Sequence, residues 1–173
     1  MWGSTPYEAY SKALEYWRDA GESDPTQGCR LIRKVLFSAT RTASRTLHMQ
    51  ASEMAALRAE GLRLAERAGA TGEHWRIQVS ECFDPKFWSY SQRKPLHAAF
   101  PRLRASALEA AAYFEQHQDW AALHEALDGA AQSTIYMRQW QEGLKLIQRR
   151  LTLPDLSPDE WADLVLWLAE AHF

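Results

Sequence analysis

The sequence predicts an all-α protein, built from seven to nine antiparallel helices in a stack or bundle of helical hairpins. Apolar residues recur at intervals of three and four along most of the chain, which is the spacing of one helix face. Short breaks rich in glycine, proline or aspartate separate these segments. Trp75, Ile77 and Val79 also fit a strand, but a single strand has no partner, so we favour helix there. The length of 173 residues suits one core, and we expect a single domain over 1–173.

The first helix is expected to begin at a capping box. Thr5 and Glu8 have the spacing at which each side chain bonds to a free backbone N–H, and Pro6 takes the first helical position. Gly21 ends this helix. Residues 22–28 are then expected to form a polar connector.

Residues 29–68 have a helical spacing of apolar residues that fits either one helix, about 60 Å long, or two shorter helices. The serine and threonine content of residues 40–46 lowers helix propensity and favours a break. Ser52 could then cap a second helix that begins near Glu53. We therefore favour two helices, which complete an N-terminal helical region over residues 1–70.

Residues 71–101 are expected to form a connector that begins with a short helix and then becomes irregular, because three prolines lie between Asp84 and Pro101. An alanine-rich helix follows and extends to about Gln116. Asp119 caps the next helix, and Trp140 lies at the beginning of another. Pro154 breaks the chain before a final capped helix.

The composition indicates a globular protein of the cytoplasm. Cys29 and Cys82 are the two cysteines, too few for a disulfide framework, so we expect a reducing compartment. We expect neither a signal peptide nor a membrane partner, since no apolar run approaches the length of a span. Residues 1–108 hold 16 basic and 11 acidic residues, whereas residues 109–173 hold 4 and 11. This asymmetry is explained most simply by attraction between the two halves of one fold.

The C-terminal third alternates large and small residues in a pattern that suits closely packed helix pairs. The positions are Leu127, Ala130, Ala131 and Thr134 in a first helix, Trp140, Gly143 and Ile147 in a second, and Trp161, Leu164, Val165 and Leu168 in a third. Over residues 127–173 this pattern resembles a tetratricopeptide repeat followed by the first helix of another. The resemblance implies that residues 102–173 form stacked hairpins with a concave surface that binds a peptide or protein segment.

The last helix has more apolar surface than an ordinary surface helix, because its apolar residues cover well over half of its circumference. Such a helix is either buried in its own core or docked on another protein or on a second copy of the chain. The residues that we expect at such an interface are Trp161, Leu164, Trp167, Leu168 and Phe173. The sequence thus favours a non-catalytic interaction or adaptor protein, although the helix could equally fold back into its own domain.

Two stretches without acidic residues support an alternative hypothesis, a protein that binds single-stranded nucleic acid through residues 30–45 and 86–104. Cations can follow the phosphates, and aromatic rings between them can stack on bases. The candidate contacts are Arg30, Arg33, Lys34, Arg41, Arg45, Lys86, Trp88, Tyr90, Arg93 and Lys94. The net charge of −2 and the lack of a known nucleic-acid motif favour the protein-interaction hypothesis. The aromatic residues, with Phe87, also suit a hydrophobic plug beneath a loop.

The sequence contains no recognised pattern of a metal site or an active site. His124 and Asp128 are one helical turn apart, but no further ligand has a workable spacing, so we expect a solvated histidine beside an acidic neighbour. There is no glycine-rich phosphate loop, no Gly-x-Ser-x-Gly and no cysteine in a recognised catalytic signature. We therefore expect no enzyme activity, no cofactor and no metal ion.

Overall fold

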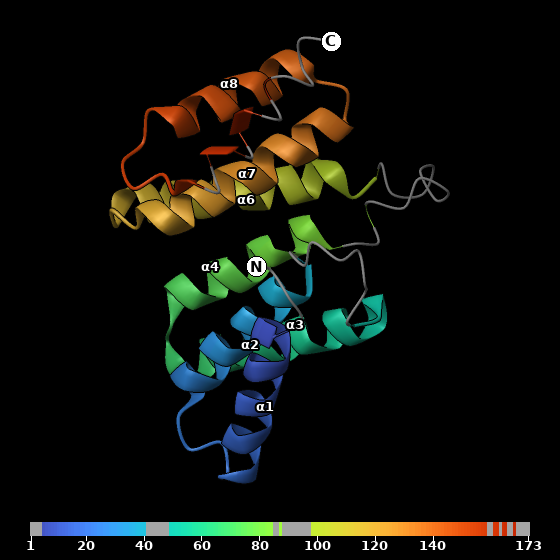
Figure 1. Ribbon diagram of the computed structural model, residues 1–173, viewed down its shortest axis with the longest axis vertical. Helices are drawn as coiled ribbons and strands as arrows, with labels where there is room; N and C mark the ends of the chain where they lie inside the picture. The colour runs from blue at the N-terminus through green and yellow to red at the C-terminus, as the bar shows by residue number, and fades with distance from the viewer. Residues whose placement is uncertain are drawn as a thin grey trace. The chain divides into compact units, whose positions relative to one another are not determined.

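The computed structural model describes residues 5–40, 49–84, 87, 98–158, 161, 162, 164, 165 and 168. These residues form helices and turns, with no strand among them, which confirms the all-α prediction. The chain divides into two compact units, Met1–Ser89 and Tyr90–Phe173 (Figure 1). The division falls within residues 71–101, the segment expected to be a connector. The assignment of residues 1–173 to a single domain stays a prediction.

In the first unit, α2 (Pro25–Thr40) is the central helix. It packs against α1 (Thr5–Asp19), α3 (Ala51–Ala68) and α4 (Thr71–Val79), and a short 3-10 helix, η1 (Ser80–Phe83), continues α4. The core of this unit consists of buried apolar side chains from four helices: Leu14, Trp17, Cys29, Ile32, Val35, Leu36, Met54, Leu57, Leu64, Ala65 and Ile77. The short helix expected around Trp75 is therefore present, and it begins at the start of the expected connector.

α2 begins earlier than expected, at Pro25, so the prediction of a connector over residues 22–28 is wrong in its second half. Asp24 Oδ1 accepts the next two free backbone N–H groups after the proline, at 2.9 and 3.2 Å. Proline at the first helical position needs no such partner. Gly28 lies inside this helix. The Trp17 ring of α1 packs directly on it, which leaves no room for a Cβ and explains why this position is a glycine.

α2 and α3 are two helices that pack side by side, so the prediction of two helices is confirmed and one straight helix is excluded. Residues 41–48, which join them, lie outside the described residues. α3 begins at Ala51, and its cap is Gln50 instead of the expected Ser52. Glu53 Oε2 accepts the Gln50 backbone N–H at 2.7 Å, which completes a capping box. The cap residue therefore lies two positions earlier than predicted.

Gly61 allows α3 to approach both α2 and α4. A Cβ at this position would lie 2.8 Å from Ile32 Cγ2 and 3.0 Å from Ile77 Cδ1. We expect Gly61→Val to lower the free energy of unfolding by about 1–3 kcal/mol, because the extra atoms overpack a tight helix crossing. Urea unfolding measures the change, with Ala59→Val on the exposed face of the same helix as the control, expected within about 0.5 kcal/mol. Equal effects of the two substitutions would contradict the close approach.

The second unit contains α6 (Phe100–Gln116), α7 (Trp120–Tyr136) and α8 (Trp140–Leu151), whose first residues are 20 positions apart. These helices agree with the expected ones, and the Asp119 side chain accepts the Ala122 N–H at 3.3 Å as the predicted cap of α7. Both connections are three-residue turns whose middle residue has a left-handed backbone, with φ of 55° in the first turn and 63° in the second. The repetition of one turn geometry produces antiparallel neighbours.

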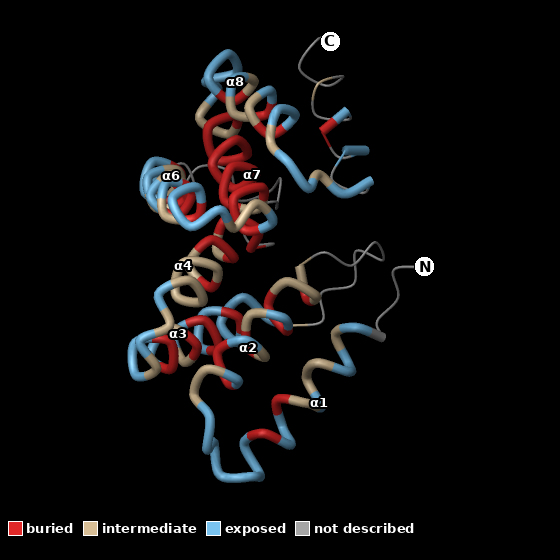
Figure 2. The backbone as a smooth tube through the Cα atoms, turned by 90° about the vertical axis from the view of Figure 1, so that its left-hand side faces the viewer, coloured by how far each residue is buried: buried red, intermediate tan, exposed pale blue. Residues whose placement is uncertain are grey.

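α7 is the central helix of this unit, in contact with α6 and α8 (Figure 1). Between Ala122 and Ile135 every residue except Glu125 is buried, as the nearly continuous red tube in Figure 2 shows. Small residues make this complete burial feasible because neighbouring helices can approach closely. Gly143 of α8 is one such contact, since a Cβ there would lie 2.6 Å from Ile135 Cγ1.

Candidate protein-docking site

A buried polar cluster joins α8 to α7. The Arg150 guanidinium of α8 donates to Asp128 Oδ1 of α7 at 2.7 Å, and Gln132 Nε2 donates to Asp128 Oδ2 at 3.2 Å. The ion-paired side chains are 2% and 5% exposed. A buried pair of this kind stabilises only when both charges are present, because either charge alone remains buried without compensation. The cluster therefore specifies how α8 lies on α7.

His124 extends this polar row toward the segment that follows α8. Its Nε2 lies 2.9 Å from the Pro154 carbonyl oxygen and must donate, since a carbonyl can only accept. His124 is fully buried, and Asp128 is 3% exposed. The expectation that His124 is solvated is therefore wrong. The four-residue spacing of His124 and Asp128 places them on the face of α7 that α8 covers.

The last helix is anchored to the core of the second unit by Leu164. Its described residues from Pro158 to Leu168 are helical, and Leu164 is fully buried. It lies in a cluster with Ala131, Ile135 and Ile147, and Leu168 packs against that cluster. The last helix thus folds back onto α7 and α8 through one of its faces.

Four large apolar side chains of α8 and the last helix remain exposed to solvent, and we call this set of residues the docking face. It consists of Trp140, Leu151, Trp161 and Val165, which are 48%, 39%, 55% and 40% exposed. Trp140 and Leu151 are eleven residues apart, which places them on one side of α8 after three turns. Trp161 and Val165 are one turn apart on the neighbouring helix. The docking face therefore presents two large aromatic rings to solvent.

The expected interface residues separate into buried and exposed ones. Trp161 is exposed, Leu164 is in the core and Leu168 is partly buried. Trp167 and Phe173 lie outside the described residues. In this conformation Trp161 is available to a partner, whereas Leu164 holds the helix in place.

Sequence reasoning missed Trp140, Leu151 and Val165 as exposed apolar residues. The tetratricopeptide resemblance assigned Trp140 and Val165 to packing positions. Gly143 and Ile147 are buried in such positions, but Trp140 begins α8 and remains half-exposed. One sequence signal could have indicated the exposure of Trp140. It directly follows a turn, and the first residue of a helix has one side open to solvent.

Of the ten candidate nucleic-acid contacts, the structure describes only those in α2. Arg30 Nε and Arg33 Nε lie 3.4 and 2.9 Å from the two carboxylate oxygens of Glu73 on α4, so one acid faces both bases. Lys34 Nζ lies 5.1 Å above the Tyr10 ring centroid. Arg41, Arg45, Lys86, Trp88, Tyr90, Arg93 and Lys94 lie outside the described residues. Nucleic-acid binding by these residues stays a prediction, and no described contact favours it over pairing within the fold.

A second buried ion pair lies in the first unit. Arg58 Nε of α3 donates to Ser80 Oγ at 3.2 Å, and an Nη atom lies 3.6 Å from Asp84 Oδ2. Burial lowers the pKa of Arg58, and the neighbouring Asp84 charge opposes this shift. These contacts attach η1 and the residue that follows it to α3, and we assign them a structural role.

The described residues contain no cluster of three or more histidine, cysteine or acidic side chains that could hold a metal ion. No helix in the described segments is both long enough and apolar enough to cross a membrane. No family model, curated protein or solved structure matches this chain. Its function is therefore inferred from the arrangement of its own side chains.

Proposed function

We propose that this chain is a non-catalytic protein-interaction module that binds another protein, or a second copy of itself, on the docking face. The observation that carries this proposal is the location of the exposed apolar side chains. Five large ones are exposed in the described part of the chain, and four of them form the docking face. Exposed aromatic residues on neighbouring helices are typical of the residues that dominate binding energy at protein interfaces.

The anchoring of the last helix supports the same proposal. Leu164 is buried three residues after Trp161 and directly before Val165, so it holds both exposed side chains in a defined position. A binding surface that is already ordered loses less entropy when a partner docks. The repeated turns of α6, α7 and α8 also suit a hairpin stack, to which a partner helix could add. Both cysteines are free and buried, which supports the proposal of a cytoplasmic protein.

The test is an affinity pull-down from the native source, with and without nuclease, that uses the unchanged chain and the double variant Trp161→Ser/Val165→Ser. We expect a stoichiometric protein partner that survives nuclease treatment. Its recovery with the double variant should fall about tenfold or more, because aromatic anchors contribute much of the binding energy. Both substituted side chains are exposed, so the fold should persist.

Tyr16→Ser is the matched control, because Tyr16 is 62% exposed and lies on α1 in the other unit. Partner recovery should be unchanged in this variant. Sedimentation of the purified chain shows whether the partner is a second copy. Loss of all partners on nuclease treatment, or equal recovery with the double variant, would overturn the proposal and favour the nucleic-acid hypothesis.

A further inference from the structure

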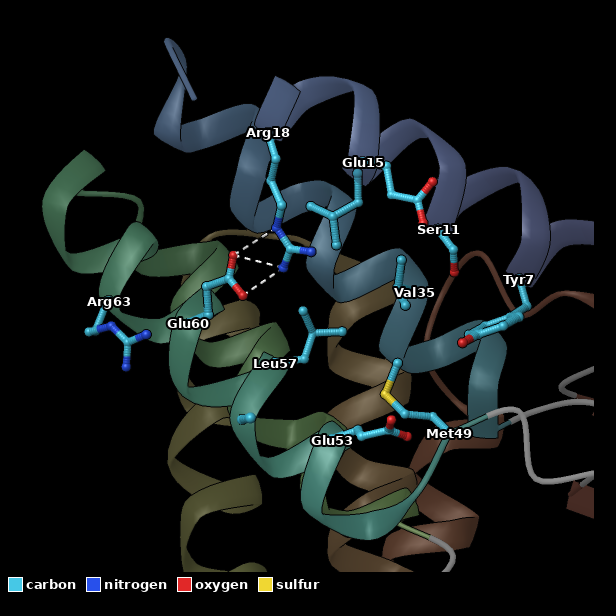
Figure 3. A pocket seen from close by; sticks show the side chains of 12 residues that line it. Tyr7, Ser11, Glu15, Arg18, Val35, Met49, Glu53, Leu57, Glu60 and Arg63 are labelled. Atoms are coloured by element: carbon cyan, nitrogen blue, oxygen red, sulfur yellow. Dashed lines mark hydrogen bonds and ion pairs between the residues drawn. The ribbon is translucent and has the colours of Figure 1, made fainter. Parts of the chain in front are cut away.

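The first unit contains a groove between α1 and α3 (Figure 3). Both helices pack on α2, and the groove between them has a volume of about 560 Å³. Its floor is formed by apolar side chains of all three helices: Leu14, Val35 and Leu57. Figure 3 shows Met49 toward one end and the Arg18–Glu60 pair toward the other. The groove therefore has an apolar floor, with Met49 toward one end and the Arg18–Glu60 pair toward the other.

The walls of the groove carry two acidic side chains that form no ion pair within the described part of the chain. The Arg18 guanidinium donates to both carboxylate oxygens of Glu60, at 2.7 to 3.3 Å, so these two charges cancel. Glu15 on α1 and Glu53 on α3 line opposite walls, and neither forms an ion pair among the described residues. Arg63 also lines the groove, at the end beyond the Arg18–Glu60 pair in Figure 3. A ligand in the groove therefore meets two exposed carboxylates, and that of Glu53 also accepts the Gln50 backbone N–H as part of the α3 cap.

The dimensions of the groove suit a helix. The wall residues of α1 extend from Tyr7 to Arg18, eleven residues or about 16 Å, which is three turns of a docked helix. The groove is open to solvent, unlike the enclosed pocket that surrounds a small molecule.

We propose that this groove binds a basic amphipathic helix of a partner protein. Apolar residues at positions i, i+4 and i+7 of that helix would cover the floor, which is the usual way a helix occupies a groove. Lysine or arginine residues beside this stripe would approach Glu15 and Glu53, and the complementary charges favour this occupant over a neutral or acidic helix. The site lies in the other unit from the docking face, and the proposal does not depend on the proposed function.

The test uses the full chain and two fluorescent synthetic helices of about 15 residues. Both have leucine at i, i+4, i+7 and i+11; one has lysines beside the stripe and the other has glutamates at the same positions. We expect the lysine helix to bind about tenfold tighter by fluorescence anisotropy, and the difference to shrink at high salt. Equal binding of both helices, or no binding of the lysine helix, would overturn the proposal.

Two pairs of variants locate the binding. Ala56 is exposed and lines the groove, whereas its neighbour Ala55 is exposed on another face of α3. Ala56→Trp should weaken binding about tenfold by filling the groove, and Ala55→Trp should change it less than about twofold. Glu15→Lys should weaken binding, whereas Glu66→Lys, the same charge change outside the groove, should have a smaller effect. An equal loss within either pair would place the helix elsewhere. Trp161→Ser should leave this binding unchanged.

Discussion

Replacing Arg150 with methionine is expected to lower the free energy of unfolding of the second unit by about 3–5 kcal/mol. The reason is the environment of its partner, because Asp128 is 3% exposed and would retain only the hydrogen bond from Gln132. A carboxylate without a cation in such a site keeps its desolvation cost but loses the attraction that offsets it. Urea unfolding followed by circular dichroism measures the loss, and hydrogen exchange in α7 assigns it to this unit.

Two further variants make this prediction specific to the buried pair. Arg149→Met removes the adjacent cation, which pairs at 2.5 Å with Glu115 while both side chains remain substantially exposed. That change should cost less than about 1 kcal/mol, as exposed ion pairs contribute little. The double variant Arg150→Met/Asp128→Leu should recover much of the lost stability, because it leaves no buried charge unpaired. If the double variant is as unstable as Arg150→Met alone, the pair does not explain the effect.

Leu164→Ala is expected to cost about 2–5 kcal/mol, the usual range when a fully buried leucine is truncated. Leu164 fills the space between Ala131 and Ile135 of α7 and Ile147 of α8, and alanine would leave a cavity there. Urea unfolding measures the change. Hydrogen exchange of the last helix should rise most, because this side chain is what attaches that helix to the core.

Val165→Ala is the matched control for this substitution. It removes apolar atoms from the next residue of the same helix, but that side chain is 40% exposed. We expect a change within about 0.5 kcal/mol. Equal destabilisation by the two substitutions would show that the last helix is not anchored through Leu164. Leu164→Ala should also weaken binding on the docking face, because Trp161 would no longer be held in place.

The two proposed surfaces use different physical means to bind protein. The docking face offers large exposed aromatic rings, so its affinity should tolerate salt. The groove between α1 and α3 combines a narrow apolar floor with carboxylates, so its affinity should fall as ionic strength rises. Measurement of each interaction at low and high salt therefore separates them even before any partner is identified.

Much of the helical framework could be predicted from the sequence because helix boundaries depend on neighbouring residues. Asp119 caps α7 and Trp140 begins α8 as the local pattern indicates. Where a predicted helix boundary was wrong, another capping residue close by in the sequence marked the true start of the helix. Asp24 before Pro25 starts α2, and Gln50 replaces Ser52 as the cap of α3. Each of these interactions involves residues no more than three positions apart.

By itself, the sequence determined that this chain is helical and that its last helix is unusually apolar. Only the tertiary structure decided which side of that helix is free: Leu164 faces the core and Trp161 faces solvent. It also placed His124 and Asp128 in the interior, where Arg150 and the Pro154 carbonyl provide their partners. These partners are 22 and 30 residues away along the chain. Contacts at that separation depend on how helices cross, which local capping and periodicity do not specify.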